Sequence, residues 1–285
     1  MPLLTPKQLY DNIPKDVKCA IGAFNVHDME YTQAVIRAAE EENAPVILML
    51  GEPMLAFANL DMLANITLFA AKNSTVPIAV TLDHGTKKEN INRCIELGIS
   101  VMCDCSHYEY KENIALTKEY TKKAHLAGVS VEAELGNIGG ANGDEVLPEN
   151  MTDPLRAKEF VEETGIDALA IAIGNCHGFY KNPPKLDIER LIKIKELVDI
   201  PLVLHGGSDL PLNMSNAAID AGIRKFNIGT DLKCAYALAI KKELLKDPMP
   251  IQPPQILGPA RDAVLKVTKQ KIRLFRSNGI AKYYK

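Results

Sequence analysis

Short apolar runs alternate with longer amphipathic stretches along the whole chain. The runs are rich in branched residues, which is typical of buried parallel strands. The amphipathic stretches carry apolar residues at i, i+3 and i+4, the spacing of a helix with one buried face. The predicted strands are Cys19–Val26, Val46–Leu50, Ile78–Asp83, Ser100–Asp104, Val129–Leu135, Ala168–Ile173, Leu202–His205 and Lys225–Ile228. The predicted helices are Met29–Glu42, Leu60–Lys72, Lys88–Leu97, Glu112–Ala127, Pro154–Thr164, Asp187–Val198, Pro211–Ala221 and Asp231–Leu245.

Eight strands, each followed by a helix, predict a closed (β/α)8 TIM barrel. We expect a helix at Thr5–Ile13 before the barrel and a helical extension at Pro259–Phe275 after it, all within a single domain spanning residues 1–285. An open doubly wound sheet would also alternate, but it would call for a glycine-rich first turn. The first turn here, Asn25-Val26-His27-Asp28, contains no glycine. The long glycine-rich stretch Gly136–Met151 is expected to be a lid over the catalytic face.

Three of the apolar runs close on a histidine that is followed at once by glycine. These histidines are His84, His177 and His205. In an α/β barrel, the carboxyl ends of the strands form the face where ligands bind. Three neutral imidazoles are also the ligand set of a catalytic zinc ion that keeps one position open. The pattern therefore predicts a metal-dependent enzyme.

Composition narrows the range of partners and compartments. The 285 residues are 47% hydrophobic, so core size is not limiting, and the net charge of −3 gives no basic field for nucleic acid or an anionic membrane surface. No apolar stretch reaches about 18 residues, and residues 1–18 lack the apolar region of a secretory signal. Six cysteines show no disulfide or metal-site spacing. We expect a cytoplasmic protein with reduced, buried thiols.

Carboxylates accompany the histidines. Asp83 directly precedes His84. Side chains of adjacent strand residues diverge, so one of these two could bind metal while the other transfers a proton. Glu132 and Glu134 share one face of a strand, where burial is costly unless they meet a cation. Asp104 ends the fourth predicted strand and is expected in the same ring.

Glycine-rich segments follow the last two strands. Gly206-Gly207-Ser208 follows His205, and Asn227-Ile228-Gly229-Thr230-Asp231 ends the eighth strand. In barrels these two loops often bind phosphate through backbone N–H groups and a helix N-terminus. Together with their position, the segments predict a phosphate site.

Several motifs together resemble the class II, metal-dependent fructose- and tagatose-bisphosphate aldolases over nearly the whole chain. They include Leu82-Asp83-His84-Gly85, Val131-Glu132-Ala133-Glu134-Leu135-Gly136, His177-Gly178 and Leu204-His205-Gly206-Gly207-Ser208. The resemblance implies that His84, His177 and His205 hold zinc, that Asp83 is the acid/base, and that Asp104 and Glu134 line an alternative metal position. It also implies a dihydroxyacetone phosphate site, partly around a monovalent cation (Na⁺ or K⁺), formed by Asn25, Gly178, Gly206, Gly207, Ser208, Asn227, Gly229 and Thr230.

The sequence departs from the fructose type of this family at the lid and in the aldehyde pocket. Asn142 replaces a lid glutamate, so that acid/base is either absent or supplied by Asp144 or Glu145. Gly229 stands where the fructose type usually has Asp, and Gly51 stands in place of a phosphate-binding serine. Glu52 beside it would repel a second phosphate if it faced the pocket. Alternatively, Glu52 turns outward and Lys266 or Arg261 neutralises that phosphate.

The sequence therefore predicts a zinc-dependent aldolase that reversibly cleaves a ketose 1,6-bisphosphate or ketose 1-phosphate to dihydroxyacetone phosphate and an aldehyde. One alternative is a dihydroxyacetone-phosphate-dependent aldolase for a non-phosphorylated aldehyde. A second is a non-catalytic sugar-phosphate sensor, and a third is a zinc hydrolase on the same barrel. The hydrolase is disfavoured because Phe24-Asn25-Val26 stands where such barrels usually have a His-x-His pair. By the resemblance, we expect a homodimer or homotetramer.

Overall fold

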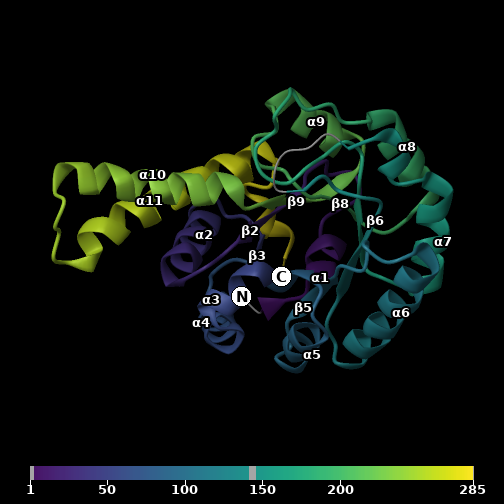
Figure 1. Cartoon of the computed structure of the whole chain (residues 1–285), viewed down its shortest axis with the longest axis horizontal. Helices are drawn as coiled ribbons and strands as arrows, with labels where there is room; N and C mark the ends of the chain where they lie inside the picture. The colour runs from purple at the N-terminus through teal and green to yellow at the C-terminus, as the bar shows by residue number, and fades with distance from the viewer. Residues whose placement is uncertain (1–2, 141–145, 285) are drawn as a thin grey trace.

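A closed parallel barrel forms the body of the protein (Figure 1). The structure, a computed structural model, describes residues 3–140 and 146–284. Within these residues the strand order is β4-β3-β2-β9-β8-β7-β6-β5, and β5 pairs with β4 to close the ring. The strands are β2 (Ile21–Asn25), β3 (Val46–Gly51), β4 (Ile78–Gly85), β5 (Ser100–Cys103), β6 (Val131–Leu135), β7 (Ala168–Ile171), β8 (Leu202–Leu204) and β9 (Ile223–Ile228).

Helices surround this barrel, and the predicted (β/α)8 architecture is confirmed. Each predicted barrel strand and helix lies within two residues of its observed bounds, because continuous burial and helical periodicity are both strong signals. The one-domain prediction stays a prediction. The barrel helices are α2 (Met29–Glu41), α4 (Leu60–Lys72), α5 (Lys88–Glu96), α6 (Tyr110–Leu126), α7 (Pro154–Thr164), α8 (Ile188–Leu197), α9 (Leu212–Asp220) and α10 (Thr230–Lys246).

Several short elements were not predicted. Strand β1 (Leu3–Leu4) pairs with the start of β4, at Ile78 and Ala79. Helix α3 (Glu52–Ala58) begins directly after β3. Two 3₁₀ turns, η1 (Pro148–Asn150) and η2 (Ile280–Tyr283), complete the described elements. These elements are too short to produce a periodic sequence signal.

Alternate strand residues supply two apolar layers. Side chains such as Phe24, Leu48 and Val80 belong to the larger cluster, which also contains apolar residues of the surrounding helices. Intervening residues such as Ala23 and Ile47 belong to a smaller cluster, which the N-terminal helix α1 (Pro6–Asp11) also joins through Leu9 and Tyr10. Because both faces of each strand are buried, the strands read as continuous apolar runs.

The C-terminal extension is longer than predicted. Helix α11 spans Pro253–Leu274, and α10 and α11 pack together as an arm that extends away from the barrel in Figure 1. The sequence predicts its start at Pro259, because proline is favoured in the first turn of a helix. Instead Pro253 takes that place behind a capping box of Gln252 and Gln255, and Pro259 lies inside the helix.

No single helix among the described residues is long and apolar enough to span a membrane. Helices α3 and α4 pass that test only as a pair, and they are bent by 101° at the break between them. Helix α4 buries Leu63, Ala64 and Leu68.

Candidate metal centre and active site

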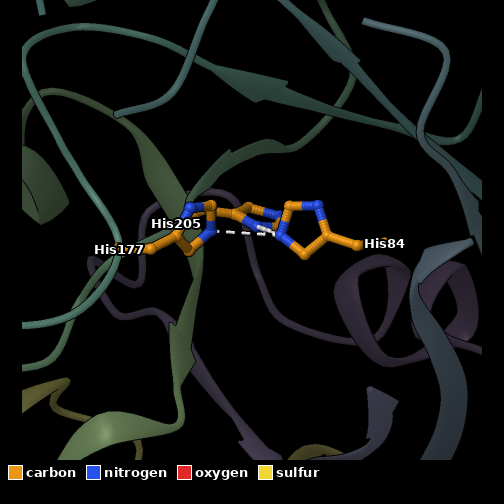
Figure 2. Close-up of side chains that lie close together, drawn as sticks. All are labelled: His84, His177 and His205. Atoms are coloured by element: carbon orange, nitrogen blue, oxygen red, sulfur yellow. Dashed lines mark hydrogen bonds between the residues drawn. The ribbon is translucent and has the colours of Figure 1, made fainter. Parts of the chain in front are cut away.

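Three imidazoles point their ring nitrogens at one another (Figure 2). Nε2 of His84 lies 3.1 Å from Nε2 of His177 and 3.0 Å from Nδ1 of His205. His84 lies within β4 and His205 directly follows β8. His177 lies on the loop after β7 rather than at a strand end, and a bridge between Gly139 and Cys176 connects that loop to the segment after β6.

The other nitrogen of each ring has a separate partner. Nδ1 of His84 lies 2.6 Å from Oδ2 of Asp104, and Nε2 of His205 lies 2.9 Å from Oε1 of Glu132. Nδ1 of His177 lies 3.2 Å from the carbonyl oxygen of Gly139. Each of these oxygens can accept the ring N–H, which leaves the three converging nitrogens with free lone pairs. Such outer partners are typical of histidines that bind metal, so the donor set fits zinc.

Asp83 and His84 both line one cavity, although adjacent strand residues should point apart. The register between β4 and β5 shifts between Leu82 and Gly85, so the strand bulges here. His84 has φ of 52°, in the left-handed region. Our expectation of diverging side chains was therefore wrong in geometry, because a bulge re-aims the side chains it contains.

Asp83 is held from both sides by amide groups. Nδ2 of Asn25 donates to its Oδ2 at 2.8 Å, and Nδ2 of Asn227 donates to its Oδ1 at 3.0 Å. Burial opposes ionisation of Asp83, but nearby His84 and His205 and the Asn25 amide together lower its pKa below the usual value. Asp83 is thus a fixed carboxylate beside the three imidazoles.

A second possible metal position consists of His84, Asp104 and Glu134. Oε2 of Glu134 is buried without a hydrogen-bond partner among the described residues and lies 4.0 Å from Nδ1 of His84. Burial, reinforced by the charge of Asp104, raises the pKa of Glu134 to about 8. Burial also opposes protonation of His84, yet Asp83, Asp104 and Glu134 raise its pKa to about 9. Burial and the charge of His84 lower the pKa of His177 to about 4.

Glu132 does meet the cation that its burial requires. Oε2 accepts from Nζ of Lys225 at 2.6 Å, while Oε1 contacts His205. The sequence suggested that a cation would be needed and left open what it was. Lys225 lies in β9, whose predicted start was this residue.

The cavity beside the imidazoles has a volume of about 510 Å³. It extends to the N-terminus of α10, where Gly229 supplies no side-chain cap. Gly207 was predicted in this site but does not line the cavity, and its N–H donates to the carbonyl oxygen of Asn227. The predicted residues that line the cavity are Asn25, Asp83, His84, His177, Gly178, His205, Gly206, Ser208, Asn227, Gly229 and Thr230.

Two polar residues of the cavity were missed from the sequence, His27 and Lys233. Both nitrogens of His27 are buried without a partner among the described residues, and burial together with the charge of Lys233 lowers the pKa of His27 to about 4. No described carboxylate forms a salt bridge with Lys233. Its position in the first turn of α10, after the predicted phosphate loop, was the available signal.

Glu52 does not face the cavity. The carboxylate is 7% exposed and accepts hydrogen bonds from the N–H groups of Thr86 and Lys87 and from Nδ2 of Asn90. Lys87, the N-cap residue of α5, provides no side-chain cap of its own, so Glu52 satisfies this helix end instead. The expectation that Glu52 faces the pocket and repels a phosphate is therefore wrong.

The two glycines that depart from the fructose type lie on either side of Asn25. A Cβ atom on Gly229 would lie 2.6 Å from Oδ1 of Asn25, and one on Gly51 would lie 3.3 Å from its Nδ2. Both departures thus leave room for the amide that donates to Asp83.

The remaining candidates lie elsewhere. Arg261 donates to Gln33, and neither Arg261 nor Lys266 lines the cavity. The lid candidates Asn142, Asp144 and Glu145 lie outside the described residues.

Comparison with known proteins is consistent with this geometry. The family described as class-II fructose-bisphosphate aldolase matches residues 7–280. The fructose-bisphosphate aldolase of Geobacillus stearothermophilus is 41% identical over 287 residues, which cover 99% of each chain. That of Staphylococcus aureus (strain Mu50) is 40% identical over 289 residues, covering 99% of this chain and 100% of the relative. The crystal structure of the YdjI aldolase from Escherichia coli K12 is similar with a TM-score of 0.86 at 35% identity, over 98% of this chain and 100% of that one. The chain therefore belongs to the class II fructose-bisphosphate aldolase family.

Proposed function

We propose that the protein is a zinc-dependent aldolase that reversibly cleaves a ketose 1,6-bisphosphate or ketose 1-phosphate to dihydroxyacetone phosphate and an aldehyde. The observation that carries this proposal is one cavity that combines three converging imidazoles, a fixed carboxylate and the N-terminus of α10. Metal, proton transfer and phosphate binding are the three requirements of this reaction. Family membership supports the same reaction class.

The metal ligands would be His84, His177 and His205, with Asp104 and Glu134 at the alternative position. The hydrogen bonds on the outer ring nitrogens support this assignment. When bound, zinc would act as a Lewis acid toward the oxygens of the substrate. The monovalent cation stays a prediction from the family resemblance.

Proton transfer would fall to Asp83. In the cleavage direction its carboxylate would take the proton of the C4 hydroxyl as the C3–C4 bond breaks. The two amides of Asn25 and Asn227 hold both carboxylate oxygens, which keeps the acceptor in place for that hydroxyl. A positioned acid/base of this kind contributes about 10²- to 10⁴-fold to a rate.

Phosphate binding would use the loops after β8 and β9. Gly206, Ser208 and Thr230 line the cavity beside the N-terminus of α10, where helix dipoles favour an anion. Gly206 has φ of 66°, and a Cβ atom there would lie 1.9 Å from the carbonyl oxygen of Cys176, so only glycine fits. Lys233 adds a positive charge to the same cavity.

Chelation and borohydride trapping together test the reaction class. A metal chelator should abolish cleavage and added zinc should restore it, whereas borohydride with substrate should not inactivate the enzyme. The alternative route through a Schiff-base lysine predicts the opposite pair of results. That pair of results would refute the proposal.

The phosphorylation of the aldehyde half is testable by experiment. Because Glu52 is turned away from the cavity and bonded to the start of α5, its charge does not oppose a phosphorylated aldehyde. The alternative is an aldolase for non-phosphorylated aldehydes, supported by Pro53 and Met54, which line the cavity beyond Gly51. A panel of aldehydes at saturating dihydroxyacetone phosphate separates the two by their kcat/KM values.

A non-catalytic sensor would bind dihydroxyacetone phosphate without exchanging its C3 proton. Proton exchange followed by NMR therefore distinguishes a sensor from an aldolase. Exchange by the zinc-loaded protein is the expected result, because Asp83 and all three imidazoles are present in one cavity.

We further infer a homodimer or homotetramer. Leu238, Leu245, Met249 and Ile251 are exposed on the arm formed by α10 and α11 and on the connection between them, and burial of such a surface favours association. Light scattering after size exclusion measures the assembly directly. A protein that stays monomeric at micromolar concentration would contradict this inference.

A cytoplasmic location is also inferred. The six cysteines, all among the described residues, form no disulfide with one another, as expected in a reducing compartment. Cell fractionation tests this inference.

A further inference from the structure

A buried ion pair lies beneath the imidazole of His205. Lys225 is 1% exposed, Glu132 is 7% exposed and His205 is fully buried. Their side chains form a chain of hydrogen bonds, 2.6 Å from Nζ of Lys225 to Oε2 of Glu132 and 2.9 Å from Oε1 of Glu132 to Nε2 of His205. We propose that Lys225 and Glu132 are positioning residues that fix the orientation of His205 and determine which of its ring nitrogens carries the hydrogen.

The pair spans the interior of the barrel. Lys225 is in β9 and Glu132 is in β6, and strands β8 and β7 separate them in the sheet. The contact between them therefore crosses the barrel rather than following a strand pairing. His205 directly follows the carboxyl end of β8. It contacts Glu132 through Nε2 and His84 through Nδ1, and so connects the ion pair to the other two imidazoles.

Packing alone does not explain the choice of charged residues. Below the cavity the neighbouring inner residues include apolar side chains such as Ile47, Met49 and Val203. Taking two charges out of water is expensive, and apolar residues of similar volume are often as stable or more stable in such positions. His205 is the further side chain that Glu132 contacts, which points to a role in positioning this histidine.

The direction of each hydrogen bond follows from the chemistry of the groups. A lysine ammonium only donates and an ionised carboxylate only accepts. With Lys225 donating to one oxygen of Glu132, the other oxygen accepts the Nε2–H of His205. Nδ1 then carries the ring lone pair, and it lies 3.0 Å from Nε2 of His84 and 3.3 Å from Nδ2 of Asn227, an amide donor. Nδ2 of Asn227 also donates to Oδ1 of Asp83 at 3.0 Å. An amide nitrogen cannot accept a hydrogen bond, so it offers no acceptor for a hydrogen on the ring of His205.

Removing the ammonium should release this arrangement. In Lys225→Met, Glu132 loses its charge partner, and the direction of its hydrogen bond to His205 is no longer determined. Outer-shell changes of this kind typically weaken metal binding by about 10- to 100-fold. We expect a loss of zinc affinity in that range, measured on metal-free protein by competition with a chromophoric chelator.

Two double variants separate positioning from packing. In Lys225→Met/Glu132→Gln, a neutral amide still offers a carbonyl oxygen to Nε2–H of His205, and zinc affinity should return to within about tenfold of the original. In Lys225→Met/Glu132→Leu, the apolar pair can restore stability but offers no acceptor. We expect the second variant to fold and yet to bind zinc as weakly as Lys225→Met.

Asp167→Asn is the matched control. Asp167 is also a buried carboxylate bonded to a histidine, His125, but it lies outside the cavity. This variant should lose stability without a change in zinc affinity. Nitrogen-15 NMR of the histidine rings in the metal-free original protein supplies a second readout, and His205 should carry its hydrogen on Nε2.

The inference rests on the proposed metal site, and the two fail in different ways. Failure of the original protein to bind zinc would overturn the proposed function. Tight zinc binding by Lys225→Met/Glu132→Leu, equal to that of the original protein, would overturn the positioning role alone. A hydrogen on Nδ1 of His205 in the metal-free protein would also overturn the positioning role.

Discussion

Replacing Glu52 by alanine should destabilise the protein without changing its preference among aldehydes. The carboxylate accepts the N–H groups of Thr86 and Lys87 and an amide hydrogen of Asn90. These residues lie at the start of α5, shortly after the bulge that holds His84. Glu52→Ala would leave all three donors without this acceptor.

The expected loss follows from the hydrogen bonds. Removing a helix cap costs about 1 kcal/mol, and each buried donor left unsatisfied costs about 1–3 kcal/mol. Water that enters the vacated space would satisfy part of this deficit, so we expect a total loss of roughly 2–4 kcal/mol. For a protein of this size, that corresponds to a decrease in Tm of roughly 3–7 °C.

Thermal unfolding of matched variants provides the measurement. Glu89→Ala is the control, because Glu89 is an exposed acidic residue in the first turn of the same helix and its removal should cost less than about 0.5 kcal/mol. Rates with neutral and phosphorylated aldehydes should change by the same factor in Glu52→Ala. An unchanged Tm, together with a selective gain for the phosphorylated aldehyde, would show that Glu52 acts on the substrate and would refute the capping role.

Three further predictions concern the cavity. Asp83→Ala should retain zinc while kcat falls by about 10²-fold or more, and loss of zinc, measured by mass spectrometry, would remove the proton-transfer role. Lys233→Met should lower kcat/KM by roughly 10- to 100-fold through the loss of a charge-assisted hydrogen bond to phosphate, with no change in bound zinc. Gly229→Ala should displace the amide of Asn25 and lower kcat to the same extent as Asn25→Ala; a Gly229→Ala enzyme with full activity would mean that this amide is not needed.

The barrel and the convergence of three histidines could be predicted because both depend on strong local signals. Strands buried on both faces read as continuous apolar runs, and the ends of those runs identify the ligand-binding face. His84 and His205 were found in this way. His177 was found from the same pattern, although its strand ends earlier and its position depends on the bridge between Gly139 and Cys176.

Contacts between distant segments could not be predicted in the same way. The hydrogen-bond partners of Glu52 lie in the loop between β4 and α5 and in the first turn of α5, more than 30 residues later in the chain. The residues next to Glu52 in the sequence give no indication that it caps α5. The sequence pattern predicts Lys225 only as the start of a strand, because its contact with Glu132 forms only in the closed barrel. Lys233 had only its position after the predicted phosphate loop as a signal, and His27 lies in a loop with no local pattern that distinguishes it.

The bulge in β4 implies a conflict between stability and activity at one backbone position. His84 adopts a left-handed conformation that costs a residue other than glycine about 1 kcal/mol or more. A stabilising redesign would regularise the strand and relieve this strain, but it would turn either Asp83 or His84 out of the cavity. Selection for thermal tolerance alone should therefore produce inactive variants at this strand, and selection that also requires turnover should retain the strained histidine.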